Sequence, residues 1–110
     1  MIDKLLNLKK KVVVITGASG SIGGEISASL AEIGCSVVLL YNKNQPEESV
    51  MKRIKASQSD YAMYMCDVTS EEGLKSSKDS IIKEFGHVDS LINCAGGNHP
   101  RATTSPENSF

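Results

Sequence analysis

Three glycines spaced at intervals of three are the residues most able to bind an anion. Gly17, Gly20 and Gly23 follow the β-branched run 12–15, and a helical apolar period begins directly after Gly20. Unpaired N–H groups at a helix N-terminus carry partial positive charge, so they hold a phosphate without a basic side chain. Glycine allows a tight turn and a close approach of the ligand to the backbone. The spacing therefore predicts a pyrophosphate-binding turn.

Three later apolar segments also end in residues that could contact a ligand. Tyr41 ends the segment SVVLLY and is followed by Asn42 and Lys43. Asp67 follows the segment YAMYMC, and Asn93 ends the segment VDSLIN. If these segments are parallel strands, their carboxyl ends converge with the glycine turn on one crevice.

The elements that must position these residues alternate between strand and helix. Apolar runs predict strands at 12–15, 36–41, 61–66 and 88–93, and the segments between them have a helical period. Short strand–helix–strand connections of this kind are right-handed and make the strands parallel. The sequence therefore predicts an α/β fold: a doubly wound, Rossmann-like parallel sheet of four strands and three helices.

The first helix is marked by an apolar period and a glycine. Ile22, Ile26, Leu30 and Ile33 recur at helical spacing, and Gly34 stands where a left-handed C-cap belongs. This pattern predicts a helix between the glycine turn and the second strand.

The other two helices also have signals at their ends. Pro46 is predicted to be the first residue of the second helix. Thr69 and Glu72 have the spacing of a capping box at the start of the third, which Gly86 ends. The apolar face of the third helix is predicted to consist of Leu74, Ile81, Ile82 and Phe85.

Composition argues against several classes of function. The 110 residues include 12 basic and 13 acidic side chains, for a net charge of −1, so nothing favours nucleic acid as a partner. No stretch is apolar enough for a signal peptide or a membrane span, and we expect a cytoplasmic protein. The three cysteines lack C-x-x-C spacing, which predicts buried reduced thiols and no zinc site.

Taken together, these segments resemble the short-chain dehydrogenase/reductase family over essentially the whole chain. Each motif is weak alone, but three of them in register are specific. The matching residues are Thr16-Gly17 with Gly23, then Asp67-Val68, then Asn93 with Ala95 and Gly96.

The resemblance implies the N-terminal, cofactor-binding half of an oxidoreductase that transfers hydride between a nicotinamide and an alcohol or carbonyl substrate. It places the pyrophosphate at residues 17–22, the adenine at Asp67 and Val68, and the central ribose at residues 93–96. The candidate cofactor-binding residues are Gly17, Ser19, Gly20, Ser21, Ile22, Gly23, Tyr41, Asn42, Lys43, Asp67, Val68, Asn93, Ala95 and Gly96.

The position of the middle glycine departs from the commonest family pattern. That pattern has glycine where this chain has Ser21, whereas here the glycine is Gly20. The observed spacing is also similar to the extended branch of the family, which leaves a sugar-nucleotide epimerase or dehydratase as an alternative. Asp67-Val68 and the Asn93–Gly96 segment resemble the single-domain branch, which we favour.

A fainter resemblance lies in the run Gly96 to Pro100. It is similar to members that act on sugar acids such as mannonate or fructuronate. The alternative is a plain turn in which Pro100 stops the strand. Residues 97–110 have no period and are predicted to form an irregular tail.

The residues after the second predicted strand favour NADP over NAD. Sites that prefer NAD have a carboxylate there, which accepts a hydrogen bond from the ribose 2′-OH. Here the position is Tyr41, followed by Asn42 and Lys43, and the first carboxylate is Glu47. A 2′-phosphate would meet a cation and an amide, although NAD remains an alternative.

No catalytic residue is assigned. The family uses a tyrosine as general acid/base, assisted by a lysine four residues later, and none of the three tyrosines here has such a lysine.

We therefore interpret residues 1–110 as an incomplete dinucleotide-binding domain of an enzyme with a small alcohol or ketone substrate. For the whole protein we expect a homo-oligomer. The alternative is a non-catalytic dinucleotide-binding or regulatory module. Leu91 and Ile92 are expected at a sheet edge that further residues or a partner chain should cover.

Overall fold

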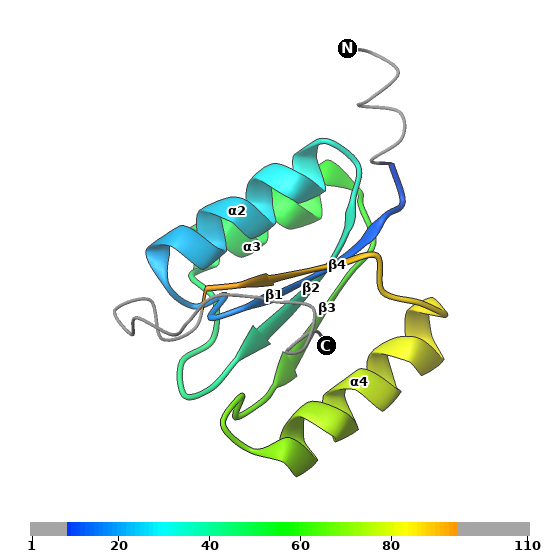
Figure 1. Ribbon diagram of the computed structural model, residues 1–110. Helices are drawn as coiled ribbons and strands as arrows, with labels where there is room; N and C mark the ends of the chain where they lie inside the picture. The colour runs from blue at the N-terminus through cyan, green and yellow to red at the C-terminus, as the bar shows by residue number, and fades with distance from the viewer. Residues whose placement is uncertain (1–8, 95–110) are drawn as a thin grey trace.

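The computed structural model describes residues 9–94, which form one parallel sheet between two layers of helix (Figure 1). The strands lie in the order β3-β2-β1-β4, and all three pairings are parallel. Helices α2 and α3 cover one face of the sheet and α4 covers the other (Figure 1). The predicted α/β fold is thereby confirmed for the described part of the chain. The elements are β1 (Val12–Thr16), α2 (Ser21–Glu32), β2 (Ser36–Tyr41), α3 (Glu48–Ser57), β3 (Tyr61–Met65), α4 (Glu71–Phe85) and β4 (Ser90–Asn93).

The two central strands are buried on both faces, as their unbroken apolar runs predict. Alternate residues face opposite layers: Ile15 and Leu39 pack with α2 and α3, whereas Val14 and Val38 pack with Ile81 of α4. Each side chain named here has 0% exposure. The core therefore fixes β1 and β2, and these strands fix the turns at their ends.

Only part of the apolar period that predicted α2 is buried, because Ile26 and Leu30 pack against the core whereas the two end residues do not. The side chain of Ile22 is 70% exposed and that of Ile33 is 37% exposed. The buried face consists of small residues, among them Gly23, Ala28 and Ala31. Small side chains allow the helix to lie close to the sheet, so the apolar spacing identified the helix but only part of its buried side.

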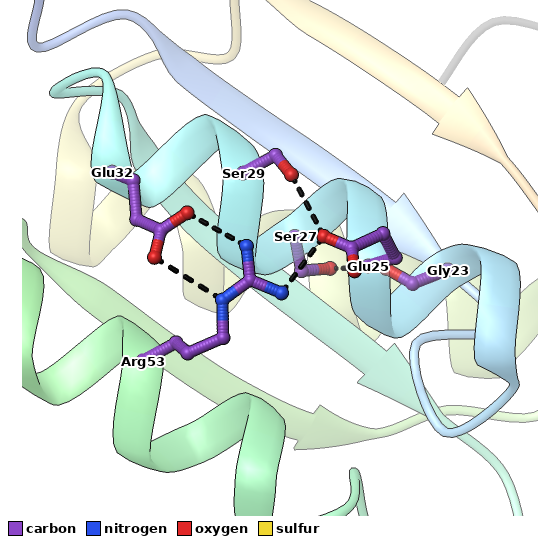
Figure 2. Close-up of polar contacts among 6 residues, drawn as sticks. All are labelled: Gly23, Glu25, Ser27, Ser29, Glu32 and Arg53. Atoms are coloured by element: carbon purple, nitrogen blue, oxygen red, sulfur yellow. Dashed lines mark hydrogen bonds and ion pairs between the residues drawn. The ribbon is translucent and has the colours of Figure 1, made fainter.

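A salt-bridge network joins the outer surfaces of α2 and α3. The guanidinium of Arg53, on α3, lies between Glu25 and Glu32 of α2, with N–O distances of 2.7–3.1 Å (Figure 2). On the same helix, buried Ser27 donates to the Gly23 carbonyl at 2.7 Å. The network thus links α3 to two turns of α2.

Two predicted helix starts are wrong by one or two residues. The second helix begins at Glu48 with Glu47 as its N-cap, so Pro46 precedes the helix instead of opening it. At α4 the N-cap is Ser70, whose Oγ accepts from the Gly73 N–H at 3.1 Å. Thr69 does not cap the helix, because its hydroxyl donates to Asp67. Gly34 has the predicted left-handed φ, at +106°, and Gly86, which ends α4 as predicted, has φ +89°.

The apolar face predicted for α4 is also only partly buried. Ile81 is completely buried, and Leu74 and Phe85 pack against the same cluster, but Ile82 is 38% exposed. Ile82 lies at the flank of the buried stripe, next to the outer surface.

Strand β4 is shorter than predicted and lies at the sheet edge, as expected. It begins at Ser90. Just before it, the Asp89 carboxylate accepts a hydrogen bond from the Val12 N–H at 2.8 Å, and the Asp89 N–H donates to the Val12 carbonyl. Leu91 and Ile92 are half-buried. Strand β3 forms the other edge and ends at Met65 rather than Cys66.

Within residues 9–94, no helix has the length and apolar character that crossing a membrane demands. Among the cysteines in this range, Cys35 and Cys66 are buried and Cys94 is half-buried. The prediction of thiols that are mostly buried is confirmed.

Candidate functional site

The glycine turn between β1 and α2 is tight and depends on glycine. Gly17 has φ +65°, in the region that favours glycine, and the Gly20 N–H donates to the Gly17 carbonyl at 3.1 Å. A Cβ at Gly23 would lie 2.3 Å from the Gly17 oxygen, so α2 starts against the turn itself. The first and third glycines are thus required by the protein backbone.

The middle glycine has no such requirement from the protein. Gly20 has φ −77°, and a Cβ there would lie 3.4 Å from the Gly17 oxygen, an ordinary contact. It is the N-cap of α2 and provides no side-chain cap, so the N–H groups of the first turn have no side-chain acceptor. Ser19 is half-buried, whereas Gly20, Ser21 and Ile22 are exposed. The open helix end can accept an anionic group.

The end of β4 is fixed to the end of β1 through one buried hydroxyl. Thr16 Oγ1 donates to Asn93 Oδ1 at 2.6 Å and accepts from the Cys94 N–H at 3.1 Å. Thr16 is 4% exposed, whereas Asn93 is exposed. The Asn93 amide is therefore held in one orientation beside the glycine turn. This role of Thr16 is not evident from the sequence, because its partner lies 77 residues away.

The loop after β2 presents a cation and no carboxylate. Tyr41 is half-buried, and Asn42 and Lys43 are exposed. The carbonyl of Leu40 accepts from the Ala18 N–H at 3.2 Å, which ties this strand end to the glycine turn. The first carboxylate after the strand is Glu47, which is the N-cap of α3.

The end of β3 carries an exposed carboxylate in a closed turn. The Cys66 N–H donates to the Tyr41 carbonyl at 2.7 Å, so the next residue, Asp67, lies close to the end of β2. Asp67 Oδ1 accepts from Thr69 Oγ1 at 2.6 Å and from the Thr69 N–H at 3.0 Å. These hydrogen bonds hold the pKa of the Asp67 carboxyl below its usual value. Val68 is half-buried and packs with the α4 layer.

The strand register brings these loops to one edge of the sheet. Thr16 pairs with both Leu40 and Asn93, and Tyr41 pairs with Met65. The candidate residues between Gly17 and Asn93 therefore lie at the carboxyl ends of four adjacent strands (Figure 1). Ala95, Gly96 and the run up to Pro100 lie outside the described residues.

Two other side chains that could transfer a proton, Tyr64 and His87, are bonded elsewhere. Tyr64 donates to Glu84 on α4, and this hydrogen bond raises the pKa of Tyr64 to about 12. His87 is 2.9 Å from Asp89 at the amino end of the strands, far from the glycine turn along the sheet. Within residues 9–94 no group of His, Cys, Asp or Glu side chains could hold a metal ion.

Comparison with known proteins gives matches over almost the whole chain. "Uncharacterized oxidoreductase UxuB" of Bacillus subtilis (strain 168) is 39% identical over 101 residues, which are 92% of this chain and 36% of the relative. The NADPH-dependent 3-quinuclidinone reductase of Rhodotorula rubra superposes with a TM-score of 0.74 at 35% identity, covering 91% of this chain and 38% of that one.

A third match is a protein of Haemophilus influenza, provisionally assigned as a D-mannonate oxidoreductase and solved with bound NAD. It has a TM-score of 0.75 at 34% identity and covers 94% of this chain and 38% of that one. The chain thus spans between 36% and 38% of the length of each of these three proteins. Residues 11–109 match the family model described as "short chain dehydrogenase". The chain belongs to the short-chain dehydrogenase family, of which it represents the N-terminal part.

Proposed function

We propose that this chain binds NADP(H) and forms the cofactor-binding part of an oxidoreductase. The observation that carries the proposal is the convergence of the glycine turn, the Lys43 loop, Asp67 and Asn93 at one edge of the sheet. The open N-terminus of α2 suits a pyrophosphate, and the exposed polar groups on both sides of it suit the two halves of a dinucleotide.

The role of Gly20 supports a ligand at this place. Neither its φ nor protein packing demands a glycine, because a Cβ there makes only an ordinary contact with the Gly17 carbonyl. A side chain would instead project at the exposed start of α2, where a phosphate would approach the backbone. A bound pyrophosphate would explain why position 20 is a glycine, which packing within the protein does not explain.

The preference for NADP rests on the charge of the β2 loop. Lys43 and Asn42 are exposed donors, and a 2′-phosphate beside them would form a charge-assisted hydrogen bond. Relatives of similar likeness differ in their cofactors, since one is NADPH-dependent and another was solved with NAD. The loop of this chain, which lacks a carboxylate, resembles what an NADP site needs.

The bound nicotinamide would supply the hydride chemistry that short-chain dehydrogenases share. The residues of this chain would bind and orient the cofactor, with 17–23 at the pyrophosphate and Asp67 and Val68 at the adenine. Asn93, Ala95 and Gly96 would lie at the central ribose. The tyrosine and lysine that handle the proton in this family would come from residues beyond Phe110, in the intact gene product.

Sugar acids or polyols are the substrate class that two of the similar structures suggest within this proposal. A D-mannonate oxidoreductase assignment and a xylitol dehydrogenase are among the structures that this chain resembles at 34% and 36% identity. Such substrates are small alcohols and ketones, which agrees with the resemblance of the run Gly96–Pro100.

Substitution Ser21→Asp tests the anion site directly. An aspartate in the first turn of α2, which has no acidic residue, should stabilise the helix by about 0.3–1 kcal/mol through the dipole. The same carboxylate should repel a pyrophosphate and weaken NADPH binding by at least about tenfold. Titration followed by nicotinamide fluorescence and thermal unfolding measure the two effects.

The matched control is Ser80→Asp, which adds the same charge on the exposed surface of α4. It should leave NADPH binding unchanged. The proposal is wrong if the wild-type chain takes up neither NADPH nor NADH, or if Ser21→Asp binds NADPH as tightly as the wild type.

A further inference from the structure

One oxygen of the Asp67 carboxylate is occupied and the other is available. Oδ1 accepts two hydrogen bonds, from the hydroxyl and the N–H of Thr69. Oδ2 has no hydrogen-bond partner among residues 9–94, and the side chain is exposed. The carboxylate therefore presents a single acceptor oxygen to solvent, in a direction that Thr69 restrains.

The backbone around Asp67 is already fixed on both sides. Before it, the Cys66 N–H is bonded to the Tyr41 carbonyl; after it, the Ser70 N–H donates to the Asp67 carbonyl at 3.0 Å. A Cβ at Gly73 would lie 3.2 Å from the same carbonyl oxygen, so α4 begins against this turn. The remaining freedom of Asp67 is rotation of its side chain, and the Thr69 hydroxyl restrains that rotation.

We infer that Thr69 is a positioning residue that orients Asp67 so that Oδ2 accepts a hydrogen bond from the exocyclic amine of the cofactor's adenine. The inference rests on the proposed function. Thr69 touches neither the base nor the reacting atoms and acts only through the carboxylate. Because both Thr69 donors lie on Oδ1, the single free oxygen is held for one donor of the ligand.

This arrangement selects a base by its substituent at C6. An ionised carboxylate accepts from an amine, whereas hypoxanthine has a carbonyl oxygen at C6 that a carboxylate repels. The preference for adenine over hypoxanthine thus reports the orientation and ionisation of Asp67. It is largely independent of the pyrophosphate and the nicotinamide, which both dinucleotides share.

The test compares Thr69→Val with Thr69→Ser and the wild type in the full chain. Val has nearly the shape of Thr but no hydroxyl, and Ser restores the hydroxyl. Each protein is titrated with NADPH and with its hypoxanthine analogue, and thermal unfolding is followed in parallel. The wild type and Thr69→Ser should prefer NADPH, and Thr69→Val should lose roughly tenfold of that preference, the effect of one hydrogen bond to a charged group.

The dependence of the preference on pH provides a second readout. The Thr69 hydrogen bonds hold the pKa of Asp67 low, so removing the hydroxyl raises that pKa. As pH falls, Thr69→Val should therefore lose its preference for NADPH at a higher pH than the wild type does. A purely structural role in the turn would not move this midpoint.

The outcomes separate this inference from the proposed function. If the wild type binds neither dinucleotide, the proposed function fails and the inference fails with it. If the wild type binds but Thr69→Val keeps the full preference, or weakens both dinucleotides equally, the inference alone is overturned. Should Thr69→Val not fold, Thr69→Ala, which also lacks the hydroxyl, decides by the same criteria.

Discussion

At the scale of single residues, Lys43 is the side chain on which the choice of cofactor depends. It is exposed in the loop after β2 and lies among neutral polar residues before Glu47. A cation in this place costs the fold little, because it is surrounded by water. Its effect should appear only when a ligand with a 2′-phosphate is present.

Substitution Lys43→Glu should weaken NADPH binding by about tenfold or more and leave NADH binding within about twofold of the wild type. The reason is that only NADPH has a phosphate for the new carboxylate to repel. Titration with both cofactors at low and high salt measures the effect, which should shrink as salt screens the charges. Lys78→Glu, on exposed α4, is the control. Equal weakening of both cofactors would contradict the assignment of Lys43 to the 2′-phosphate.

Residues whose role depends on local backbone geometry were predictable from sequence. Gly17 must turn out of a strand and Gly34 must end a helix, and both have the positive φ that these tasks require. The Thr69 and Thr16 roles were not found. Thr69 bonds to Asp67, only two residues away, but the capping-box spacing assigned Thr69 to the helix start instead; the partner of Thr16, Asn93, is 77 residues away and is brought close only by folding. A hydroxyl alone in the sequence does not identify its acceptor.

At the scale of elements, the packing of α2 against α3 limits how α2 can move. Gly24 lies against Val50, and Arg53 bonds to Glu25 and Glu32 (Figure 2). These hydrogen bonds lower the pKa of both carboxyls. The helix whose N-terminus would hold the pyrophosphate is therefore held on its outer side as well as by the sheet.

A double-mutant cycle of Gly24→Ala and Val50→Ala tests this contact. A Cβ at position 24 would lie 2.9 Å from Val50 Cγ2. Gly24→Ala alone should cost about 1–3 kcal/mol in overpacking, partly offset by about 1 kcal/mol of helix propensity. In the Val50→Ala background the clash is absent, so the same substitution should stabilise the protein. Denaturant unfolding gives the coupling energy, and additive effects would show that the helices do not touch there.

The helices were the elements whose packing was least predictable. The period of Ile22, Ile26 and Leu30 correctly located α2, but the fully buried positions of this helix are glycine, serine and alanine. Small residues have low hydropathy, so a search for periodic apolar residues does not identify them as buried. The strands were easier, because Val14 and its neighbours must be apolar on both faces of a covered parallel sheet.

At the scale of the whole molecule, Asp89 joins the first and last strands at their amino ends. Its carboxylate accepts from the Val12 N–H, pairs with His87 at 2.9 Å and lies 3.9 Å from the Lys11 amine. The Val12 N–H is the main reason that the pKa of Asp89 lies below its ordinary value, and the charges of His87 and Lys11 add to this. Thr16 and Asn93 form the corresponding link at the carboxyl ends.

The lowered pKa of Asp89 gives a stability that depends on pH. The contribution is fully present above the unfolded pKa, near 3.8, and is lost as pH falls through the lower folded pKa. Asp89→Asn should therefore have a lower melting temperature than the wild type at neutral pH. The gap between the two should close as pH falls below about 4. Asp79→Asn, on the exposed surface of α4, is the control. A gap that is constant across this range would show that Asp89 acts without its charge.

The strand order has a consequence for the chain during its synthesis. Strand β1 emerges from the ribosome first but lies inside the sheet, between β2 and a β4 that is translated some 77 residues later. Until Ser90–Asn93 emerge, one hydrogen-bonding side of a valine-rich strand remains without its native neighbour on the nascent polypeptide. Chaperones that shield extended apolar segments would therefore be needed most in that interval, before the last strand docks.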